Sequence, residues 1–502
     1  FYDVQKAYDR VEVDDMMLIL WNQGVKGKIW RLIRILNQNL TAKIKTCHGL
    51  TRKIKREVGS KQGGKLIVPM FAKLTDTLAE DMENETNLGV KVDSVKVDCL
   101  LWVDDVMTVA EGKPQQQETL NMVHDYGKKH RLKWGIEKCA VLEIGNHKEI
   151  KEIWKMGDAE VRHRNSYKYL GEIICRNGKN IENIEERSKK AKTSTKCITT
   201  IGKQEIMRKI EINATLKLHE TVTIPILLHN CETWCLSKTD ELKLERIELW
   251  CLKRIFNLPR TTPSAAVRFV SGTLLTKVRI DSKQLIYLQR ILKSGESSKL
   301  GHFLNVLDEL QIGWALSIRA KLAEYGLIDD WESIRGKSAS QWKVEVKVSA
   351  DQRNKELILE DCVKRGREGT TNKTKTKSII SVLQDNLYVR KPDFAVCMLN
   401  KLGAKSIIMA RYGMLLCKNN YKHQYGTNVC GVCKVEDNEE HRMNTCIELR
   451  GINKYDKDEK VPFSNVYSEE RHILVEVSNV ILNIWNLKNG KNEMNMSESG
   501  PE

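Results

Sequence analysis

The stretches FYDVQKAYDRV (residues 1–11) and LLWVDDVMTV (residues 100–109) decide the fold. Asp3 lies on a predicted strand that runs into a helix, and the pair Asp104 and Asp105 lies between two apolar, strand-like runs. A carboxylate in apolar surroundings has to be compensated by a cation or by hydrogen bonds. At the tip of a hairpin, two adjacent carboxylates can point at one metal site. On its own, however, an Asp-Asp dipeptide is more often a turn or the start of a helix.

A third segment separates these two and adds a different kind of binding group. It reads GSKQGGKLIVP over residues 59–69, where the glycines permit close approach of the backbone to a ligand and the Gln62 amide can hydrogen-bond a base or a sugar. The alternative is a simple loop followed by a helix. Oxygen ligands suit Mg²⁺, and two such ions roughly 3.5–4 Å apart support nucleotidyl transfer.

The composition indicates a multidomain protein with a polyanionic partner. The 502 residues include 83 Lys and Arg against 66 Asp and Glu, a formal net charge of +17. Such a balance favours nucleic acid, although many basic proteins bind none. No apolar stretch of 18 residues and no signal peptide occur, so neither membrane insertion nor secretion is predicted. The 14 scattered cysteines favour reduced thiols inside the cell.

Hydrophobic periodicity predicts an α+β region followed by a helical one. Residues 1–145 mix short β-rich runs with helices over 16–22 and 27–37, and residues 166–175 alternate like a hairpin. Long amphipathic segments then follow over 184–201, 206–226 and 239–256. The polar stretch 335–377 is predicted to be a basic linker, either solvated or in contact with nucleic acid.

A cluster of Cys and His near the end has the spacing of a zinc site. Cys430, Cys433, His441 and Cys446 form a C-x2-C-x7-H-x4-C pattern. Three thiolates and an imidazole complete a tetrahedral set, so the predicted Zn²⁺ is structural and leaves no open position for catalysis. In a chain with 14 cysteines, the same spacing can also arise by chance.

Five motifs in order resemble the palm of reverse transcriptases from retrotransposons without long terminal repeats. They are FYDVQKAYDRV, GSKQGGKLIVP, WVDD (102–105), LKWGIEKC (132–139) and YKYLG (167–171). The resemblance implies an α+β polymerase palm truncated at its amino-terminal side, without the fingers region, followed by a helical thumb and connector and a small zinc knuckle. The expected divisions are 1–175 for the partial palm, 176–334 for thumb and connector, 335–377 for the linker, 378–450 for the helical segment with its CCHC knuckle, and 451–502 for the tail.

The resemblance also implies a role for individual residues. Asp3 and Asp104 would be ligands of two Mg²⁺ ions, with Asp105 completing the catalytic set. The ring of Tyr8 would be a steric gate against the ribose 2′-hydroxyl. The positions implied to bind nucleotide or template are Tyr8, Gln62, Gly63 and Lys138, and those of the primer grip are Tyr167, Tyr169, Leu170 and Gly171.

The helical region contributes cations whose role the sequence leaves open. Arg187, Lys189, Lys190, Lys192 and Lys196 lie on one predicted helix. They would track the phosphates of a template-primer duplex if this helix belongs to a thumb, or they form a solvated face.

The implied function is RNA-directed DNA polymerisation in target-primed reverse transcription. Its partners would be element RNA as template, target DNA as primer and deoxynucleoside triphosphates, in the nucleus and cytoplasm, with no membrane partner. The chain departs from the family pattern at Gly64-Lys65, where Asp-Pro is usual, and at Trp102-Val103. These departures favour a rival, a decayed or domesticated copy that binds nucleic acid without catalysis. A second rival, a polymerase that copies RNA into RNA, is disfavoured by Tyr8.

Overall fold

The structure is a computed structural model that describes residues 1–38, 40–55, 59, 64, 66–85, 87–145, 153–201, 212–328, 330–367, 405, 407 and 408. It contains two compact units. Among the described residues, unit 1 comprises those of 1–183 and 297–306, and unit 2 comprises those of 184–296 and those from 307 onward. The described part mixes helices with small sheets, as the α+β pattern predicts. No helix in these ranges is both long and apolar enough to cross a bilayer.

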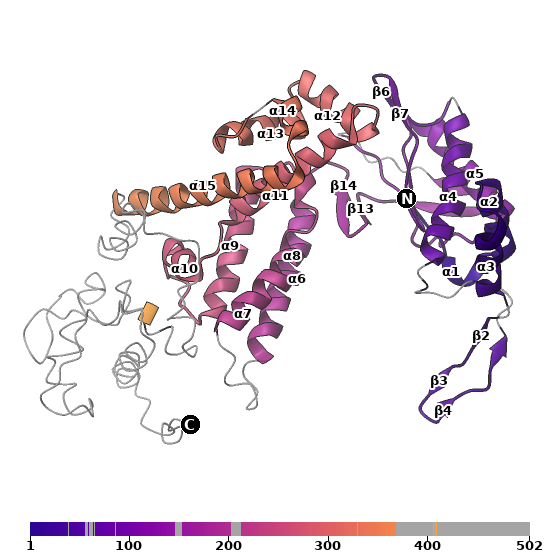
Figure 1. Ribbon diagram of the computed structural model, residues 1–502, viewed down its shortest axis with the longest axis horizontal. Helices are drawn as coiled ribbons and strands as arrows, with labels where there is room; N and C mark the ends of the chain where they lie inside the picture. Colours follow the sequence, from indigo (N-terminus) through magenta and orange to yellow (C-terminus); the bar gives the residue numbers. More distant parts are fainter. Residues whose placement is uncertain are drawn as a thin grey trace, which may run out of the picture. The chain divides into compact units, whose positions relative to one another are not determined.

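Unit 1 alternates strands and helices (Figure 1). In chain order its elements are β1 (Tyr2–Asp3), α1 (Ala7–Arg10), α2 (Val13–Asn22), α3 (Gly27–Asn37), β2 (Thr41–Ala42), β3 (Lys45–Thr46), β4 (Gly49–Leu50), β5 (Ile54–Lys55), α4 (Ile67–Asn84), β6 (Val90–Val92), β7 (Val95–Val97), β8 (Cys99–Trp102), β9 (Asp105–Thr108), α5 (Lys113–Lys129), β10 (Ala140–Val141), β11 (Trp154–Met156), β12 (Ala159–His163), β13 (Ser166–Tyr169), β14 (Glu172–Cys175), the start of α6 (Ile181–Ile201) and most of α12 (Lys299–Glu309).

A three-stranded antiparallel sheet, β1-β9-β8, is at the centre of unit 1. Tyr2 and Val106 are opposite each other in this sheet, and both are buried. They join one apolar core with the inner faces of α2, α4 and α5, to which Phe71, Leu78 and Val123 contribute fully buried side chains. The predicted helix over 27–37 is confirmed, and the one over 16–22 begins earlier, at Val13. The hairpin over 166–175 is also confirmed.

Unit 2 is helical, as the periodicity predicts. Its elements are most of α6 (Ile181–Ile201), α7 (Ile212–Leu218), the π-helical turn η2 (His219–Thr223), α8 (Ile224–Leu227), the 3-10 turn η3 (Cys231–Thr233), α9 (Lys238–Ile255), α10 (Ser264–Ser271), α11 (Thr276–Ser294), the end of α12 (Lys299–Glu309), α13 (Gly313–Glu324), α14 (Trp331–Gly336) and α15 (Ala339–Arg367).

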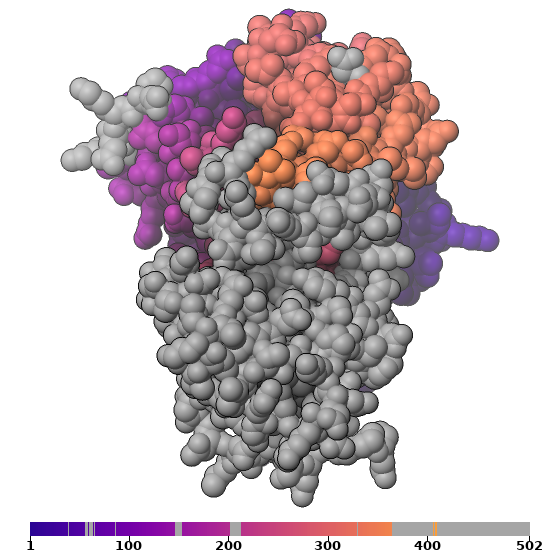
Figure 2. All heavy atoms as spheres, turned by 90° about the vertical axis from the view of Figure 1, so that its left-hand side faces the viewer, coloured from indigo at the N-terminus to yellow at the C-terminus, as the bar shows by residue number. Residues whose placement is uncertain are grey.

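The prediction of a linker over 335–377 is wrong for most of the described residues in that range. Residues 339–367 form α15, which packs along α11. Trp342, Val346 and Ala350, spaced four apart, are buried, and the Trp342 indole donates a hydrogen bond to the Leu285 carbonyl at 2.8 Å. A narrow apolar stripe in a polar helix gives a weak signal, because most of its residues face water. The coral and orange atoms of α13 to α15 adjoin one another in Figure 2.

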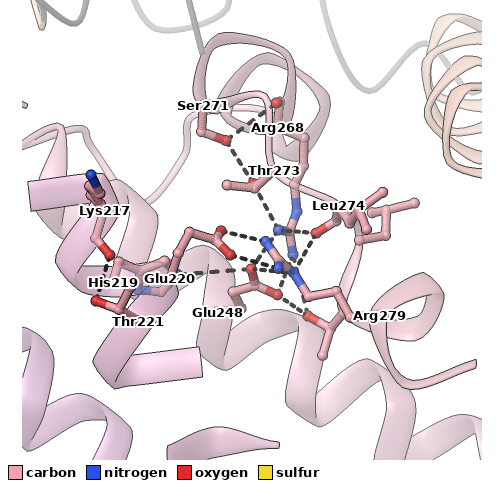
Figure 3. A network of polar contacts seen from close by, with 12 residues as sticks. Lys217, His219, Glu220, Thr221, Glu248, Arg268, Ser271, Thr273, Leu274 and Arg279 are labelled. Carbon is pink, nitrogen blue, oxygen red and sulfur yellow. Dashed lines mark hydrogen bonds and ion pairs between the residues drawn. The ribbon is translucent and has the colours of Figure 1, made fainter. Parts of the chain in front are cut away.

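A buried ionic network joins α9, α10 and α11 (Figure 3). Arg268 on α10 is fully buried, and its guanidinium donates to both carboxylate oxygens of Glu248 at 2.9 and 3.0 Å and to Glu245 at 2.7 Å. Arg279 on α11 forms a two-pronged pair with Glu220 at 2.6 and 2.8 Å. Burial alone would raise the pKa of Glu248, but the charges of the two arginines and the hydrogen bonds hold it well below its ordinary value.

Removing the Arg268 guanidinium should therefore destabilise unit 2 strongly. Breaking a buried pair leaves an uncompensated charge, at a cost of about 3–5 kcal/mol. We expect Arg268→Met to lower the free energy of opening of α9 by that amount, measured by hydrogen exchange of its backbone amides. Arg246→Met is the matched control, because Arg246 lies on α9 and is exposed. Equal effects of the two substitutions would contradict this account of the network.

Candidate active site

The central sheet of unit 1 brings the predicted carboxylates together. Asp3 on β1 is directly opposite Asp105 on β9. Residues directly opposite in an antiparallel pair have their Cβ atoms about 4.5–5.5 Å apart and on the same face. Trp102 pairs with Asp105 to close the hairpin between β8 and β9, so Asp104 lies in its two-residue turn. The predicted meeting of distant strands is thus confirmed for Asp3 and the Asp104-Asp105 tip.

The turn itself has an uncommon backbone. Val103, its first residue, has a φ of 58°. This left-handed region is rare for a β-branched residue, and such conformations cost on the order of 1–3 kcal/mol. The neighbouring Trp102 side chain is 64% exposed. Trp102 and Val103 are the two residues before the Asp pair that differ from the family pattern. This difference therefore lies at the tip of the hairpin that carries Asp104.

The carboxylates repel one another. Burial raises the pKa of Asp105, and the charges of Asp104 and Asp3 raise it further. Burial raises the pKa of Tyr8, and the charge of Asp104 raises it further. The hydrogen bond and charge of Asp3 raise the pKa of Lys138, and Asp104 makes a smaller contribution in the same direction. Three acidic groups and Tyr8 therefore occupy one neighbourhood. Nevertheless, no three His, Cys, Asp or Glu side chains are arranged to hold a metal ion within the described ranges.

Lys138 compensates one of these carboxylates directly. Its ammonium lies 3.1 and 3.3 Å from the two oxygens of Asp3. The Lys138 side chain is 64% exposed, so water screens this ion pair and it adds little to stability. Its position does confirm that the LKWGIEKC segment lies beside β1, where the backbone N–H of Gly135 donates to the Asp3 carbonyl at 2.8 Å.

Gly135 is a residue of the site that sequence reasoning did not single out. A Cβ atom there would lie 2.9 Å from Oδ2 of Asp3. Trp134 precedes it and forms a bridge with Val4, which fixes the loop against β1. The LKWGIEKC motif contains Gly135, but the motif alone does not show that this glycine lies against the Asp3 carboxylate.

The hairpin of β13 and β14 contributes the predicted Tyr167, Tyr169, Leu170 and Gly171. The Tyr167 hydroxyl donates to the Lys138 carbonyl at 2.9 Å, and its ring stacks on Phe1 with centroids 4.3 Å apart. Burial, with smaller contributions from nearby charges, raises the pKa of Tyr167 to about 12. Leu170 and Gly171 both have positive φ, as the two-residue turn of this hairpin requires. The hairpin therefore lies close to Lys138.

Tyr8 lies on α1, one turn beyond β1, where its ring contacts Phe71 on α4 with centroids 5.6 Å apart. Gly59 lies against the backbone of Asp9 on the same helix. Gln62 and Gly63 lie outside the described residues, as do the four predicted zinc ligands Cys430, Cys433, His441 and Cys446.

One predicted nucleic-acid contact in unit 2 is wrong. Arg187 is buried, and its guanidinium lies 3.0 Å from Nδ1 of His229. The other predicted cations of α6 face outward: Lys189, Lys190 and Lys196 are exposed and Lys192 is half-buried. Nothing in the local pattern distinguishes the inward arginine, because it is one of several cations on the same helix.

Comparison with known proteins agrees with this geometry. Residues 1–174 match the family model described as reverse transcriptase (RNA-dependent DNA polymerase). Over 279 residues the chain is 22% identical to the RNA-directed DNA polymerase from mobile element jockey of Drosophila melanogaster, covering 52% of this chain and 28% of that protein. The chain thus spans little more than a quarter of this relative. Together, the two matches support a reverse transcriptase of a retrotransposon without long terminal repeats.

Gly59 lies against the backbone of Asp9 and provides a test of the geometry. Its φ is +84°, and a Cβ atom there would lie 2.5 Å from the Asp9 carbonyl oxygen. We expect Gly59→Ala to cost about 3 kcal/mol, from the strained φ and the clash with backbone. Gly24→Ala is the matched control, because Gly24 has a φ of +93° and open space around it, so only about 1 kcal/mol is lost. Chemical denaturation of unit 1 compares the two, and equal costs would refute the close contact.

Proposed function

We propose that this chain supplies the catalytic carboxylates of an RNA-directed DNA polymerase. The supporting observation is the register that sets Asp3 opposite Asp105, with Asp104 in the adjoining turn. A hydroxyl at the end of a primer would attack the α-phosphate of a deoxynucleoside triphosphate, and pyrophosphate would leave. The match of residues 1–174 to the reverse transcriptase family supports this reaction.

The carboxylates suit Mg²⁺ in charge and in chemistry. Their mutual repulsion, which helps to raise the pKa of Asp105, is what a cation between them would relieve. Carboxylate oxygens are the ligands that Mg²⁺ prefers. We propose that Asp3 and Asp104 hold two such ions and that Asp105 completes the set. When bound there, Mg²⁺ would assist ionisation of the primer hydroxyl and offset the charge that develops on the pyrophosphate.

The surrounding side chains would bind and orient the reactants. The Lys138 ammonium, now on Asp3, would be within reach of a triphosphate and could donate to its oxygens. The hairpin with Tyr167, Tyr169, Leu170 and Gly171 would hold the primer end, and its bond to the Lys138 carbonyl couples the two. Gln62 and Gly63 would position template and nucleotide.

The finer roles follow the family. We propose that element RNA is the template, that nicked target DNA is the primer, and that synthesis is target-primed. We also propose that Cys430, Cys433, His441 and Cys446 hold a structural Zn²⁺, since three thiolates and an imidazole form a complete tetrahedral set. The exposed lysines of α6 would contact the phosphates of the duplex.

A second candidate is a copy that binds nucleic acid without catalysis. The observation in its favour is the tip of the catalytic hairpin, where Trp102 is exposed and Val103 has a strained φ. Gly64-Lys65 is a second departure from the family pattern, in the segment of residues 59–69. Salt-dependent binding of RNA, without any primer extension, would identify this candidate.

The carboxylate assignment is tested by primer extension on an RNA template. We expect Asp104→Asn to lower the extension rate on the order of 10³-fold, because metal ligation is worth several kcal/mol in the transition state, while RNA binding is retained. Asp125→Asn is the matched control, since Asp125 is an exposed carboxylate on α5 of the same unit. If Asp104→Asn extends as fast as Asp125→Asn, Asp104 holds no catalytic metal.

The role of Tyr8 is tested by sugar selectivity. We expect Tyr8→Ala to raise incorporation of ribonucleotides relative to deoxynucleotides by at least about tenfold, because the ring no longer clashes with the 2′-hydroxyl. Tyr8→Phe keeps the ring against Phe71 and should keep the selectivity. The readout is the ratio of kcat/KM for the two nucleotides. Loss of selectivity in Tyr8→Phe would instead assign the discrimination to the hydroxyl.

A further inference from the structure

One segment of unit 1 carries positive charge that no acidic residue offsets. Residues 16–56 contain no Asp or Glu, although 66 of the 502 residues are acidic and a stretch of this length would hold about five at average composition. The same segment has ten cations: Lys26, Lys28, Arg31, Arg34, Lys43, Lys45, Arg52, Lys53, Lys55 and Arg56.

The structure places most of these cations on α3 and on a two-stranded ribbon, residues 41–55. The ribbon is formed by pairing of β2 with β5 and of β3 with β4, and it extends away from the rest of unit 1 (Figure 1). Its residues are exposed throughout except for Thr51, which is half-buried. An isolated two-stranded hairpin is marginally stable in water. Because its residues are exposed on both faces, either face of the ribbon is open to a partner. We call α3 and the ribbon together the basic arm.

Four lysines of the ribbon lie along its two paired segments. Thr41 is opposite Lys55, and Lys45 is opposite Leu50. Lys43 directly follows β2 and Lys53 directly precedes β5, so Lys43, Lys45, Lys53 and Lys55 all belong to the two paired segments of the ribbon. No ion pair joins any of these lysines to a residue in the described part of the chain. Their charge is thus available to an anion.

The arm also exposes apolar and aromatic groups beside its cations. Ile44 and Leu50 on the ribbon are 57% and 66% exposed. Where α2 meets α3, the rings of Trp21 and Trp30 contact each other, with Lys26 and Arg34 over their faces. The rings hold these two cations by cation–π contacts, and the exposed ammonium and guanidinium groups can pair with the phosphates of a nucleic acid.

We propose that the basic arm binds a strand of nucleic acid through its phosphates, outside the carboxylate site. The choice of nucleic acid over another polyanion rests on the proposed function. A two-stranded ribbon also has a width that a nucleic-acid groove admits, and its lysines offer several exposed ammonium groups to successive phosphates. An anionic membrane surface is the competing partner of similar charge.

The test compares two variants of the full chain with the same change in net charge. The arm variant carries Lys43→Gln, Lys45→Gln, Lys53→Gln and Lys55→Gln. The control variant carries Lys91→Gln, Lys128→Gln, Lys129→Gln and Lys155→Gln, all exposed in the same unit. Binding is measured over a range of salt with single-stranded RNA, single-stranded DNA, an RNA–DNA duplex and phosphatidylserine vesicles.

We expect the arm variant to bind at least one of the nucleic acids about tenfold or more weakly at 0.1 M salt. The slope of log K against log salt should fall by about 2 to 3, since each phosphate contact to a single strand contributes roughly 0.7. The three nucleic acids tell which form the arm takes. Equal losses in the control variant, an unchanged slope, or a loss of vesicle binding alone would overturn the proposal.

A second readout locates binding at the arm without using catalysis. Cys47 is exposed near the tip of the ribbon, and Cys235 is an exposed cysteine of unit 2. Bound RNA should slow alkylation of Cys47 several-fold more than that of Cys235, and equal rates with and without RNA at Cys47 would refute binding there. Neither readout depends on primer extension. A failed polymerase assignment is thereby distinguished from a failed arm.

Discussion

The pairing of β1 with β9 is the constraint on which the candidate site depends. Like charges directly opposite in a sheet are unfavourable, yet Asp3 is opposite Asp105. The adjacent pair, Tyr2 and Val106, lies on the other face and is buried in the core of unit 1. Because side chains alternate along a strand, burying that pair fixes the register and forces the carboxylates together on the opposite face. The apolar core thus overcomes the repulsion, and the Lys138 ammonium offsets the charge of one of the two carboxylates, Asp3.

The sequence predicted those parts of the fold that local patterns encode. Alternation gave the hairpin over 166–175, and the apolar spacing gave the helix over 27–37. The motifs also placed Asp3 and Asp105 near each other, because a catalytic role for both requires it. They did not reveal how the loops approach the strand. The contact of Gly135 with Asp3 and that of Gly59 with Asp9 are tertiary, and a glycine in a motif does not show which atom lies against it.

The errors have a common physical origin. The linker predicted over 335–377 became α15 because a buried residue recurs at every fourth position from Trp342 to Cys362, and this narrow stripe docks the helix on α11. Arg187 was assigned to the surface although it is buried beside His229. In the same way, the full burial of Arg268 and Glu248 has no local signal. A charged residue can be buried when a side chain from another helix pairs with it. A single sequence does not show which residues of different helices form such pairs.

The two units use charge in opposite ways, and this difference separates stability from recognition. In unit 2, Arg268 forms ion pairs with Glu245 and Glu248, so its charge is compensated within the network that joins the helices. Such a network is costly to break but offers nothing to a ligand. In the basic arm the cations are exposed, and residues 16–56 provide no acid to pair with them. Repulsion among these cations opposes a well-ordered ribbon, and an anionic partner would remove it. The net charge of +17 therefore carries less information than its distribution, because only the uncompensated part can steer a polyanion toward the carboxylates.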